Sequence, residues 1–117
     1  MTLRFTLPWP PKELSSNARL HYMALARAKK SYRTACAWQA KAQGAGRIEA
    51  ERLSVHLVFV PPDRRMRDDQ NLIAAMKAGL DGLADVLGVD DSKWHVTHDP
   101  YSTATIGGMV KVVVVAG

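Results

Sequence analysis

The sequence has one cysteine, few aromatic residues and no long apolar run, and each shortage excludes a class of protein. A lone Cys36 cannot form an internal disulfide, which fits a reducing compartment, and we interpret it as a small buried apolar residue. No apolar stretch approaches the roughly 18 residues of a membrane span. The start of the chain has no charged-then-apolar signal layout. These features predict a cytoplasmic protein without a membrane partner, folded as one domain over residues 1–117.

Acidic residues are scarce in the first part of the chain. Residues 1–48 contain nine lysines and arginines and one acid, Glu13. Residues 49–117 contain seven lysines and arginines and ten acids. Every aspartate lies between positions 63 and 99: Asp63, Asp68, Asp69, Asp81, Asp85, Asp90, Asp91 and Asp99. A basic half predicts a polyanionic partner. A cluster of aspartates is typical of turns, helix caps or metal ligands.

Apolar periodicity predicts four strands and two helices. The strands are expected at 2–7, 52–60, 94–99 and 109–115. An alanine-rich basic stretch from Met23 to Gln43 predicts a first helix, whose expected core face is Leu25, Ala28, Tyr32, Ala35, Cys36 and Gln39. A second helix is expected from about Asp69 to Leu87, with a core stripe of Leu72, Met76, Leu80, Leu83 and Leu87. The order β-α-β-α-β-β predicts an α/β fold of the mixed α+β kind, a small mixed β-sheet packed by two helices.

The strand expected at 52–60 has apolar residues on both sides. Leu53, Val55, Leu57 and Phe59 alternate along one side. Val58 and Val60 make the other side partly apolar, which is typical of a sheet covered on both faces. His56 shares this second side, and we interpret it as a packed strand residue rather than a metal ligand.

The second helix is expected to present a polar stripe opposite its core. At 100° per residue, Ala74, Lys77 and Asp81 fall within about 40° of Gln70. Helical side chains lean toward the N-terminus, so the Lys77 ammonium is expected to approach the Asp68–Gln70 end. Asp90 and Asp91 follow the far end of the helix and meet Asp68 only if the chain folds back alongside it.

Such a convergence of carboxylates and a lysine favours phosphodiester hydrolysis. Carboxylates hold Mg²⁺ together with substrate phosphates, and the metal activates water. Lys77 would orient that water or neutralise developing charge. Neighbouring phosphates would be held by Arg64, Arg65 and Arg67. Structural interpretations remain open beside this one: Asp68 or Asp69 as a helix cap, Asp90 and Asp91 as turn residues, and Lys77–Asp81 as a surface pair.

The chain resembles the RusA family of Holliday junction resolvases over most of its length. The likeness runs through "FTLPWPPKELSSN" (5–17), "KKSYR" in the first helix, "PPDRRMRDDQN" and "LIAAMKAGLDGLADVLGVDDSKW" (72–94). Its most specific part is Arg-Asp-x-x-Asn, then a lysine and Asp-Gly-Leu, then Asp-Asp after a turn.

The resemblance implies an α/β homodimer that cuts opposing strands of a four-way DNA junction with paired nicks. It implies Mg²⁺, with Mn²⁺ as a substitute, and no small-molecule cofactor. Asp68 matches the family's first catalytic acid, Asp91 the acid of the later pair, and Lys77 the lysine of one family branch. Asn71 matches the asparagine after the acidic motif. The residues expected to bind DNA are Asn17, Lys29, Lys30, Arg33, Arg64, Arg65 and Arg67.

The chain departs from the family pattern Asp-x-Asp-Asn at Gln70. Glutamine keeps a carbonyl oxygen but loses the charge, so it should bind metal more weakly, and Asp69 is a candidate to replace that charge. The expected metal ligands are Asp68, Asp69, Gln70 and Asp91, and the expected catalytic residues are Asp68, Gln70, Lys77 and Asp91. Two alternatives remain: a non-catalytic DNA-binding protein on the same scaffold, and a nuclease of general branched or single-stranded DNA.

Overall fold

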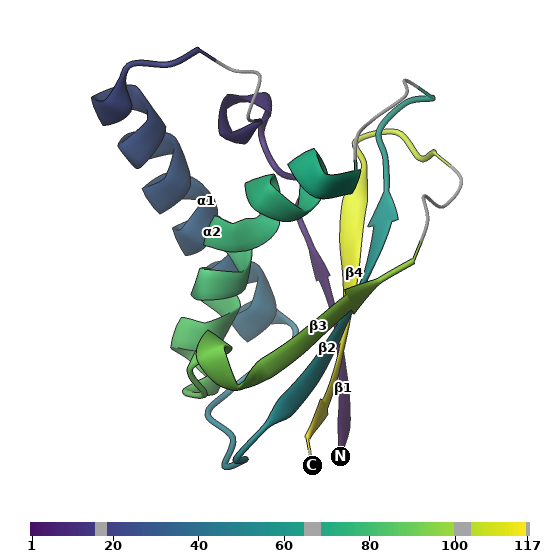
Figure 1. The fold of residues 1–117 in the computed structure, drawn as a ribbon. Helices are drawn as coiled ribbons and strands as arrows, with labels where there is room; N and C mark the ends of the chain where they lie inside the picture. Colours follow the sequence, from purple (N-terminus) through teal and green to yellow (C-terminus); the bar gives the residue numbers. More distant parts are fainter. Residues whose placement is uncertain (16–18, 65–68, 100–103, 117) are drawn as a thin grey trace.

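The fold consists of a four-stranded sheet with two long helices on one side of it (Figure 1). This is a computed structural model, and it describes residues 1–15, 19–64, 69–99 and 104–116, with the backbone alone at Asp69. The elements in chain order are β1 (Thr2–Leu7), η1 (Lys12–Leu14), α1 (Tyr22–Ala42), β2 (Leu53–Val60), α2 (Asp69–Leu87), η2 (Asp91–Lys93), β3 (Trp94–His98) and β4 (Met109–Ala116). The α+β class and the order β-α-β-α-β-β expected from the sequence are confirmed.

The strand order β1-β4-β2-β3 makes the sheet mixed. β4 pairs antiparallel with both β1 and β2, while β3 runs parallel to β2. A parallel pair needs a long crossover connection, and α2 with η2 supplies it between β2 and β3. This crossover brings the residues that follow α2 back to the sheet, beside the helix that they have just left.

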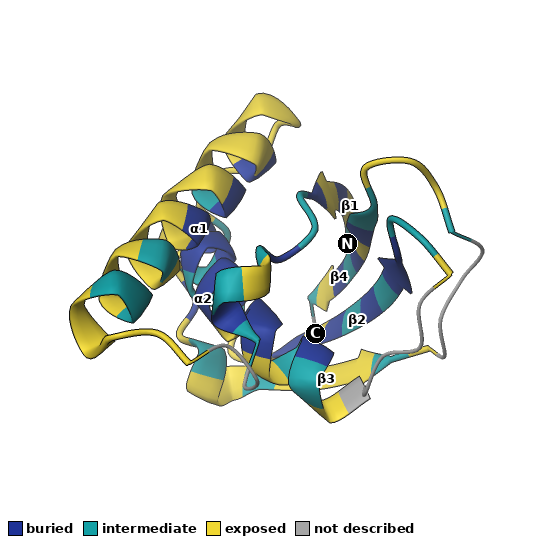
Figure 2. Cartoon of the chain, turned by 90° about the horizontal axis from the view of Figure 1, so that it is seen from above, coloured by how far each residue is buried: buried dark blue, intermediate teal, exposed yellow. Residues whose placement is uncertain are grey.

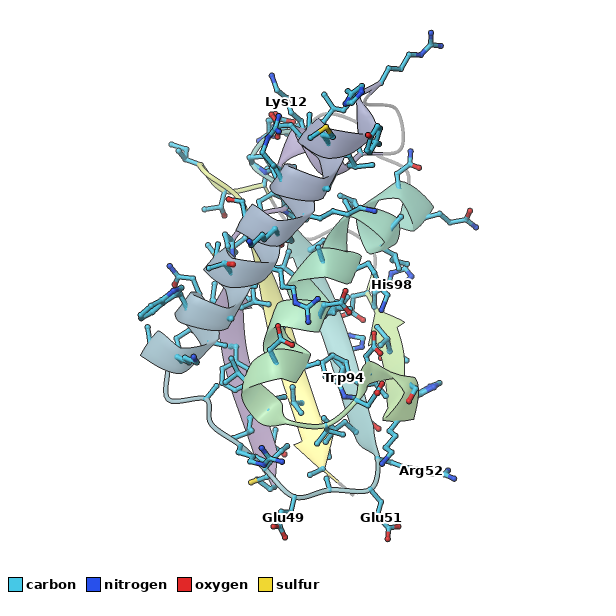
Figure 3. All side chains as sticks on the ribbon, turned by 90° about the vertical axis from the view of Figure 1, so that its left-hand side faces the viewer. Lys12, Glu49, Glu51, Arg52, Trp94 and His98 are labelled. Atoms are coloured by element: carbon cyan, nitrogen blue, oxygen red, sulfur yellow. The ribbon has the colours of Figure 1, made fainter. Side chains whose placement is uncertain are left out.

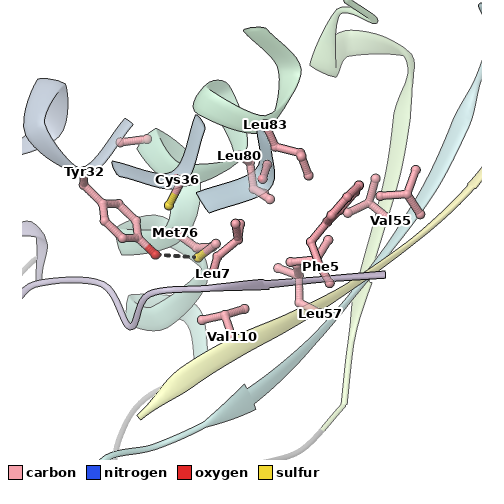
Figure 4. Close-up of a cluster of buried hydrophobic side chains, with 14 of the residues drawn as sticks. Phe5, Leu7, Tyr32, Cys36, Val55, Leu57, Met76, Leu80, Leu83 and Val110 are labelled. Atoms are coloured by element: carbon pink, nitrogen blue, oxygen red, sulfur yellow. Dashed lines mark hydrogen bonds between the residues drawn. The ribbon is translucent and has the colours of Figure 1, made fainter. Parts of the chain in front are cut away.

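Alternating strand residues and both helices build one core. Phe5 and Leu7 of β1, four residues of β2 and three valines of β4 are buried toward the helices: Leu53, Val55, Leu57, Phe59, Val110, Val112 and Val114. The predicted α2 stripe of Leu72, Met76, Leu80, Leu83 and Leu87 is buried against them. Figure 4 shows part of this cluster between helix and sheet.

The prediction of a sheet covered on both faces was wrong. α1 and α2 lie on the same face (Figures 1 and 2), and the opposite face carries exposed Arg4, Thr6 and Lys111 next to a 41% exposed Val115. His56 also lies on that open face. Its ring nitrogens contact the Thr97 hydroxyl at 2.6 Å and an Asp99 carboxylate oxygen at 3.0 Å. His56 is therefore half-exposed and polar in its contacts, and it links neighbouring strands.

The expected core face of α1 was partly wrong. Tyr32, Cys36 and Ala40 are buried, whereas Ala35 and Gln39 are exposed. The Tyr32 hydroxyl donates to the Pro8 carbonyl at 2.7 Å and lies 3.2 Å from Met76 Sδ, so it joins α1 to α2 and to the segment that follows β1 (Figure 4). Cys36 is fully buried in the core, which confirms it as a packed apolar residue, and this burial raises the pKa of its thiol to about 11.

Within the part of the chain that the structure describes, no helix combines the length and the apolarity of a membrane span. Figure 3 views the helical side: Lys12 of η1 lies at one end of the molecule, and Glu49, Glu51 and Arg52 of the α1–β2 connection lie at the other.

Candidate functional site

Lys77 lies at the centre of a cluster of charged side chains on α2 and η2. Its ammonium donates to Asp81 Oδ1 at 3.1 Å, one turn along the same helix, which confirms the expected surface pair. It also donates to Asp91 Oδ2. The Lys77 side chain remains 62% exposed, so solvent and a dissolved anion can reach the ammonium.

Asp91 reaches Lys77 because the chain reverses sharply after α2. Gly88 adopts φ +75°, which other residues rarely tolerate, and its amide donates to the Ala84 carbonyl as the helix ends. Val89 is buried, and its carbonyl accepts from Trp94 Nε1 at 3.1 Å. Asp90 then caps η2 by accepting from the Ser92 amide at 2.9 Å. These contacts orient Asp91 back along α2.

The charges of Lys77 and Asp91 support each other. The Lys77 ammonium holds the pKa of the Asp91 carboxyl below its usual range, with smaller contributions from Asp81 and Asp90. In return, the hydrogen bond to Asp91 and, to a smaller extent, the hydrogen bond to Asp81 raise the pKa of Lys77. Both groups are charged at neutral pH, so the cluster contains one cation shared by two carboxylates.

A second ion pair joins the two helices beside this cluster. Arg33 of α1 donates through Nε and Nη2 to both carboxylate oxygens of Asp85, each at 2.7 Å. This pairing lowers the pKa of Asp85. The helices come close because Gly82 has no side chain: a Cβ there would lie 2.2 Å from the Arg33 carbonyl oxygen. The close crossing brings the basic side of α1 next to the polar stripe of α2.

A groove of about 380 Å³ runs between the helices toward their N-terminal parts. Its floor is apolar, built by Leu14 and small α2 side chains, and its walls carry four cations. The lining residues are Leu14, Lys29, Lys30, Arg33, Ala74, Ala75, Lys77, Ala78 and Asp81. Arg33 and Lys77 already pair with acids, whereas no described ion pair engages Lys29 or Lys30, so the lining of the groove is suited to an anionic group.

The groove continues into a smaller acidic hollow of about 300 Å³. Arg33 and Asp81 line both, so the two form one continuous surface. The hollow is lined by Arg33, Asp81, Ala84, Asp85, Gly88, Val89, Asp90 and Asp91. Asp81 and Asp91 therefore lie on the same continuous surface as the basic residues of the groove.

The structure brings together part of the residue set expected from the sequence. Lys77 and Asp91 contact each other, and Lys29, Lys30 and Arg33 line the same groove. Gln70 is exposed in the first turn of α2, and Arg64 is exposed after β2. Asp69 begins α2, but its side chain is not described, and Asn17, Arg65, Arg67 and Asp68 lie outside the described residues.

One correction concerns the direction in which the Lys77 side chain points, and two acids join the candidate site. The described Lys77 ammonium bonds toward Asp81 and Asp91, on the C-terminal side, whereas the sequence-based expectation directed it toward the Asp68–Gln70 end. Arg33, expected to bind DNA, donates through Nε and Nη2 to Asp85, and its contact with DNA stays a prediction. Sequence reasoning left Asp81 and Asp85 out of the site. Asp81 follows Lys77 by four residues and Asp85 follows Asp81 by four, and this spacing was the signal that could have included them.

Asp81 and Asp91 suit a hard divalent cation chemically. The Lys77 ammonium stands between their oxygens, so the two carboxylates already share one positive charge. Mg²⁺ binds through one or two carboxylates completed by water and phosphate oxygens. Among the described residues, however, no group of three or more His, Cys, Asp or Glu side chains is arranged to hold a metal ion.

Comparisons with known proteins leave the activity open. No family model matches the chain. An uncharacterized protein of Xylella fastidiosa strain Temecula1 is 40% identical over 96 residues, which cover 80% of this chain and 62% of that protein. The chain thus spans about six-tenths of the length of the curated relative that it matches.

Proposed function

We propose that this chain is a divalent-metal-dependent endodeoxyribonuclease that resolves four-way DNA junctions by paired nicks. The observation that supports the proposal best is the continuous groove, in which Lys29, Lys30 and Lys77 lead into the carboxylates of Asp81 and Asp91. A polyanion needs the cations, and phosphodiester hydrolysis at a metal needs the carboxylates. The resemblance of the RDDQN and VDDSKW segments to junction resolvases supplies the substrate class.

The residues of the groove would act mainly by positioning and by charge. Lys29 and Lys30 would bind backbone phosphates, because their exposed ammonium groups lie on the same wall of the groove. Lys77 would neutralise charge that develops on the scissile phosphate. Its pairing with Asp91 and Asp81 keeps it protonated and fixes where the ammonium lies before DNA arrives.

A bound Mg²⁺ would polarise the phosphate and supply a water nucleophile. Asp91 and Asp81 are the described carboxylates that would hold it, and the predicted ligands Asp68, Asp69 and Gln70 would add to them. Displacement of the Lys77 ammonium from Asp91 would free that carboxylate for the ion and free the ammonium for the phosphate.

A cleavage assay tests this proposal directly. Purified protein is incubated with a synthetic four-way junction and, in parallel, with a linear duplex of the same sequence, with Mg²⁺, with Mn²⁺ and with chelator. We expect symmetric nicks in the junction, little cleavage of the duplex and no cleavage with chelator. Equal cleavage of both substrates would support the alternative nuclease of general branched or single-stranded DNA. No cleavage with either metal would reject the nuclease.

A second candidate is a non-catalytic DNA-binding protein. Two observations favour it: Gln70 replaces an acid of the family pattern, and the Asp91 carboxylate already bonds the Lys77 ammonium. Thermal unfolding with and without Mg²⁺ separates the candidates, since an ion that binds only the folded state raises the melting temperature. A binding protein would keep its junction affinity and show no shift with Mg²⁺.

The proposed enzyme acts as a homodimer in the cytoplasm and uses no small-molecule cofactor. Paired nicks in opposed strands need two active sites, which a closed two-fold dimer supplies most simply. The open face of the sheet and the Pro8–Pro11 segment offer surface for such an interface. Light scattering at micromolar protein, with and without junction DNA, should give a dimer mass, and a monomer under both conditions would contradict the assembly.

A further inference from the structure

Trp38 differs from the other two tryptophans in being exposed. Trp9 packs edge-to-face on the Phe59 ring with centroids 6.1 Å apart, and Trp94 donates its indole hydrogen to Val89. Trp38 is 69% exposed on α1. Its one described ring contact is with Lys41, whose Nζ lies 5.9 Å from the ring centroid. Packing within the chain therefore does not explain this large apolar ring.

The surroundings of Trp38 are basic and free of acids. At 100° per residue, Arg27, Thr34, Trp38 and Lys41 fall within about 60° of one another, and the buried Cys36 lies about 160° from Trp38. All four are exposed, and this side of α1 faces away from α2 and from the sheet (Figure 2). Residues 22–42 contain no aspartate or glutamate. We call Arg27, Thr34, Trp38 and Lys41 the outer face of α1.

A flat ring among cations has the composition of a platform for nucleic acid. Arg27 and Lys41 can neutralise phosphates, and they lie about 21 Å apart along the helix axis, which spans several nucleotides. The Trp38 ring can stack on a nucleobase, but bases in a duplex already stack on each other and present only their edges. A stacking ring therefore gains from an unpaired base alone.

We infer that the outer face of α1 binds single-stranded nucleic acid, with an unpaired base stacked on Trp38 and backbone phosphates on Arg27 and Lys41. This surface is separate from the Lys77–Asp91 cluster, because the residues that line the groove and the acidic hollow do not include Trp38, Arg27 or Lys41. The inference goes beyond the proposed nuclease and requires neither metal nor cleavage.

The test measures anisotropy of a labelled oligothymidylate and of a blunt duplex of the same length, in chelator. Trp38→Ala should weaken oligothymidylate binding at least about fivefold, since one stacked base contributes roughly 1–3 kcal/mol, and should change duplex binding less than twofold. Trp38→Tyr should keep most of the affinity because it keeps a ring. The matched control is Tyr22→Ala, a 74% exposed ring about 160° away around the same helix, which should bind like wild type.

Wild-type tryptophan emission gives a readout that does not depend on any variant. Unlabelled oligothymidylate should quench it, and quenching should be lost in Trp38→Tyr, whose remaining tryptophans are half-buried. Four results would each overturn the inference: no quenching of the wild type, wild-type affinity in Trp38→Ala, an equal loss in Tyr22→Ala, or equal losses on single strand and duplex. A change of oligomeric state in Trp38→Ala, with oligothymidylate affinity unchanged, would assign this face to a second copy of the chain instead.

Discussion

At the scale of single residues, Gln70 stands where the family pattern has an acid, so it is the side chain expected to limit the proposed metal site. It is exposed in the first turn of α2, where a new carboxylate is favoured by the helix dipole. We predict that Gln70→Asp lowers the Mg²⁺ concentration for half-maximal junction cleavage, because a charged oxygen binds a divalent cation more strongly than an amide oxygen. A Mg²⁺ titration of the initial nicking rate measures the effect.

Asp69→Asn is the matched comparison, because it removes a charge from the neighbouring position. If Gln70 is a weak ligand, Asp69→Asn should be nearly silent in the same titration. If Asp69 already replaces the missing acid, Asp69→Asn should abolish nicking and Gln70→Asp should change little, since added carboxylates then repel each other. A Gln70→Asp variant that needs more Mg²⁺ than wild type would contradict both interpretations.

The Arg33–Asp85 pair predicts a pH dependence of stability. Arg33 lowers the pKa of Asp85, so folding favours the ionised carboxylate. This contribution is complete above the unfolded pKa of about 4 and is lost as the pH falls through the lowered folded pKa. Because the ion pair is exposed, its contribution to stability is small, and we expect Asp85→Asn to melt only slightly below wild type near neutral pH. This difference in melting temperature should shrink as the pH falls toward about 3.

Differential scanning calorimetry across this pH range measures that difference. Glu49→Gln, which removes an exposed acid from the α1–β2 connection, is the control and should follow wild type throughout. A melting difference for Asp85→Asn that grows on acidification would contradict a carboxylate stabilised by Arg33.

The sequence allowed only some residue contacts to be predicted. Lys77–Asp81 follows from helix geometry, since residues four apart share a face. The Lys77–Asp91 contact depends on the chain reversal at Gly88 and on the anchoring of Val89, which no local pattern specifies. Arg33–Asp85 spans 52 positions and exists because α1 crosses α2 closely, so it could not be derived from either helix alone.

At the scale of elements, strong periodicity made α2 predictable and weak periodicity made α1 less so. The α2 bounds and all five stripe residues agree with the expectation, because leucines and a methionine define one face clearly. In α1, alanines occur on every side, and the pattern assigned Ala35 to the core, whereas the structure buries Ala40 instead. Their small side chains fit either environment.

The close crossing of α1 and α2 at Gly82 predicts that one added methyl group there lowers the stability of the fold. In Gly82→Ala the new Cβ would meet the Arg33 carbonyl oxygen at 2.2 Å, a contact with backbone that a side-chain rotation cannot relieve. The helices must separate, which costs about 1–3 kcal/mol for overpacking. We expect a clearly lower urea midpoint in chemical unfolding, and weaker DNA binding because the groove between the helices widens.

Gly46→Ala provides the control for that substitution. A Cβ at Gly46 has nothing within 4 Å, and the backbone there does not need positive φ. Its urea midpoint should equal or slightly exceed that of wild type, because alanine reduces the entropy of the unfolded chain. Equal midpoints for both variants would show that the helices do not cross as closely as described.

At the scale of the whole molecule, the sequence predicts that basic and acidic residues are separated along the chain, but it does not predict where they lie in the fold. The basic first part and the aspartates at 63–99 are evident in the composition. Their meeting in one groove depends on both helices lying on the same face of the sheet, whereas the apolar second side of β2 suggested two covered faces. β2 and β4 pair antiparallel, and such a pair with one open face also tolerates Val58 and Val113 there.

The basic groove predicts a steep salt dependence of DNA binding. Replacing Lys29 and Lys30 together with alanine should weaken junction binding and flatten the log–log salt slope by up to about two units. Arg52→Ala, an exposed cation of the α1–β2 connection away from the groove, is the control and should leave the slope unchanged. An unchanged slope in the double variant would mean that DNA does not enter the groove.

The most direct measurement of the proposed activity compares wild type and Asp91→Asn on one four-way junction, with nicking and binding recorded on the same samples. Asparagine keeps the shape of Asp91 and removes the charge that faces Lys77. A metal-dependent junction nuclease predicts that nicking falls at least about a hundredfold, as losses of an essential charge-stabilising group commonly do, while junction affinity stays within a few-fold of wild type. Nicking by Asp91→Asn at the wild-type rate would contradict the assignment of this site as the centre of catalysis.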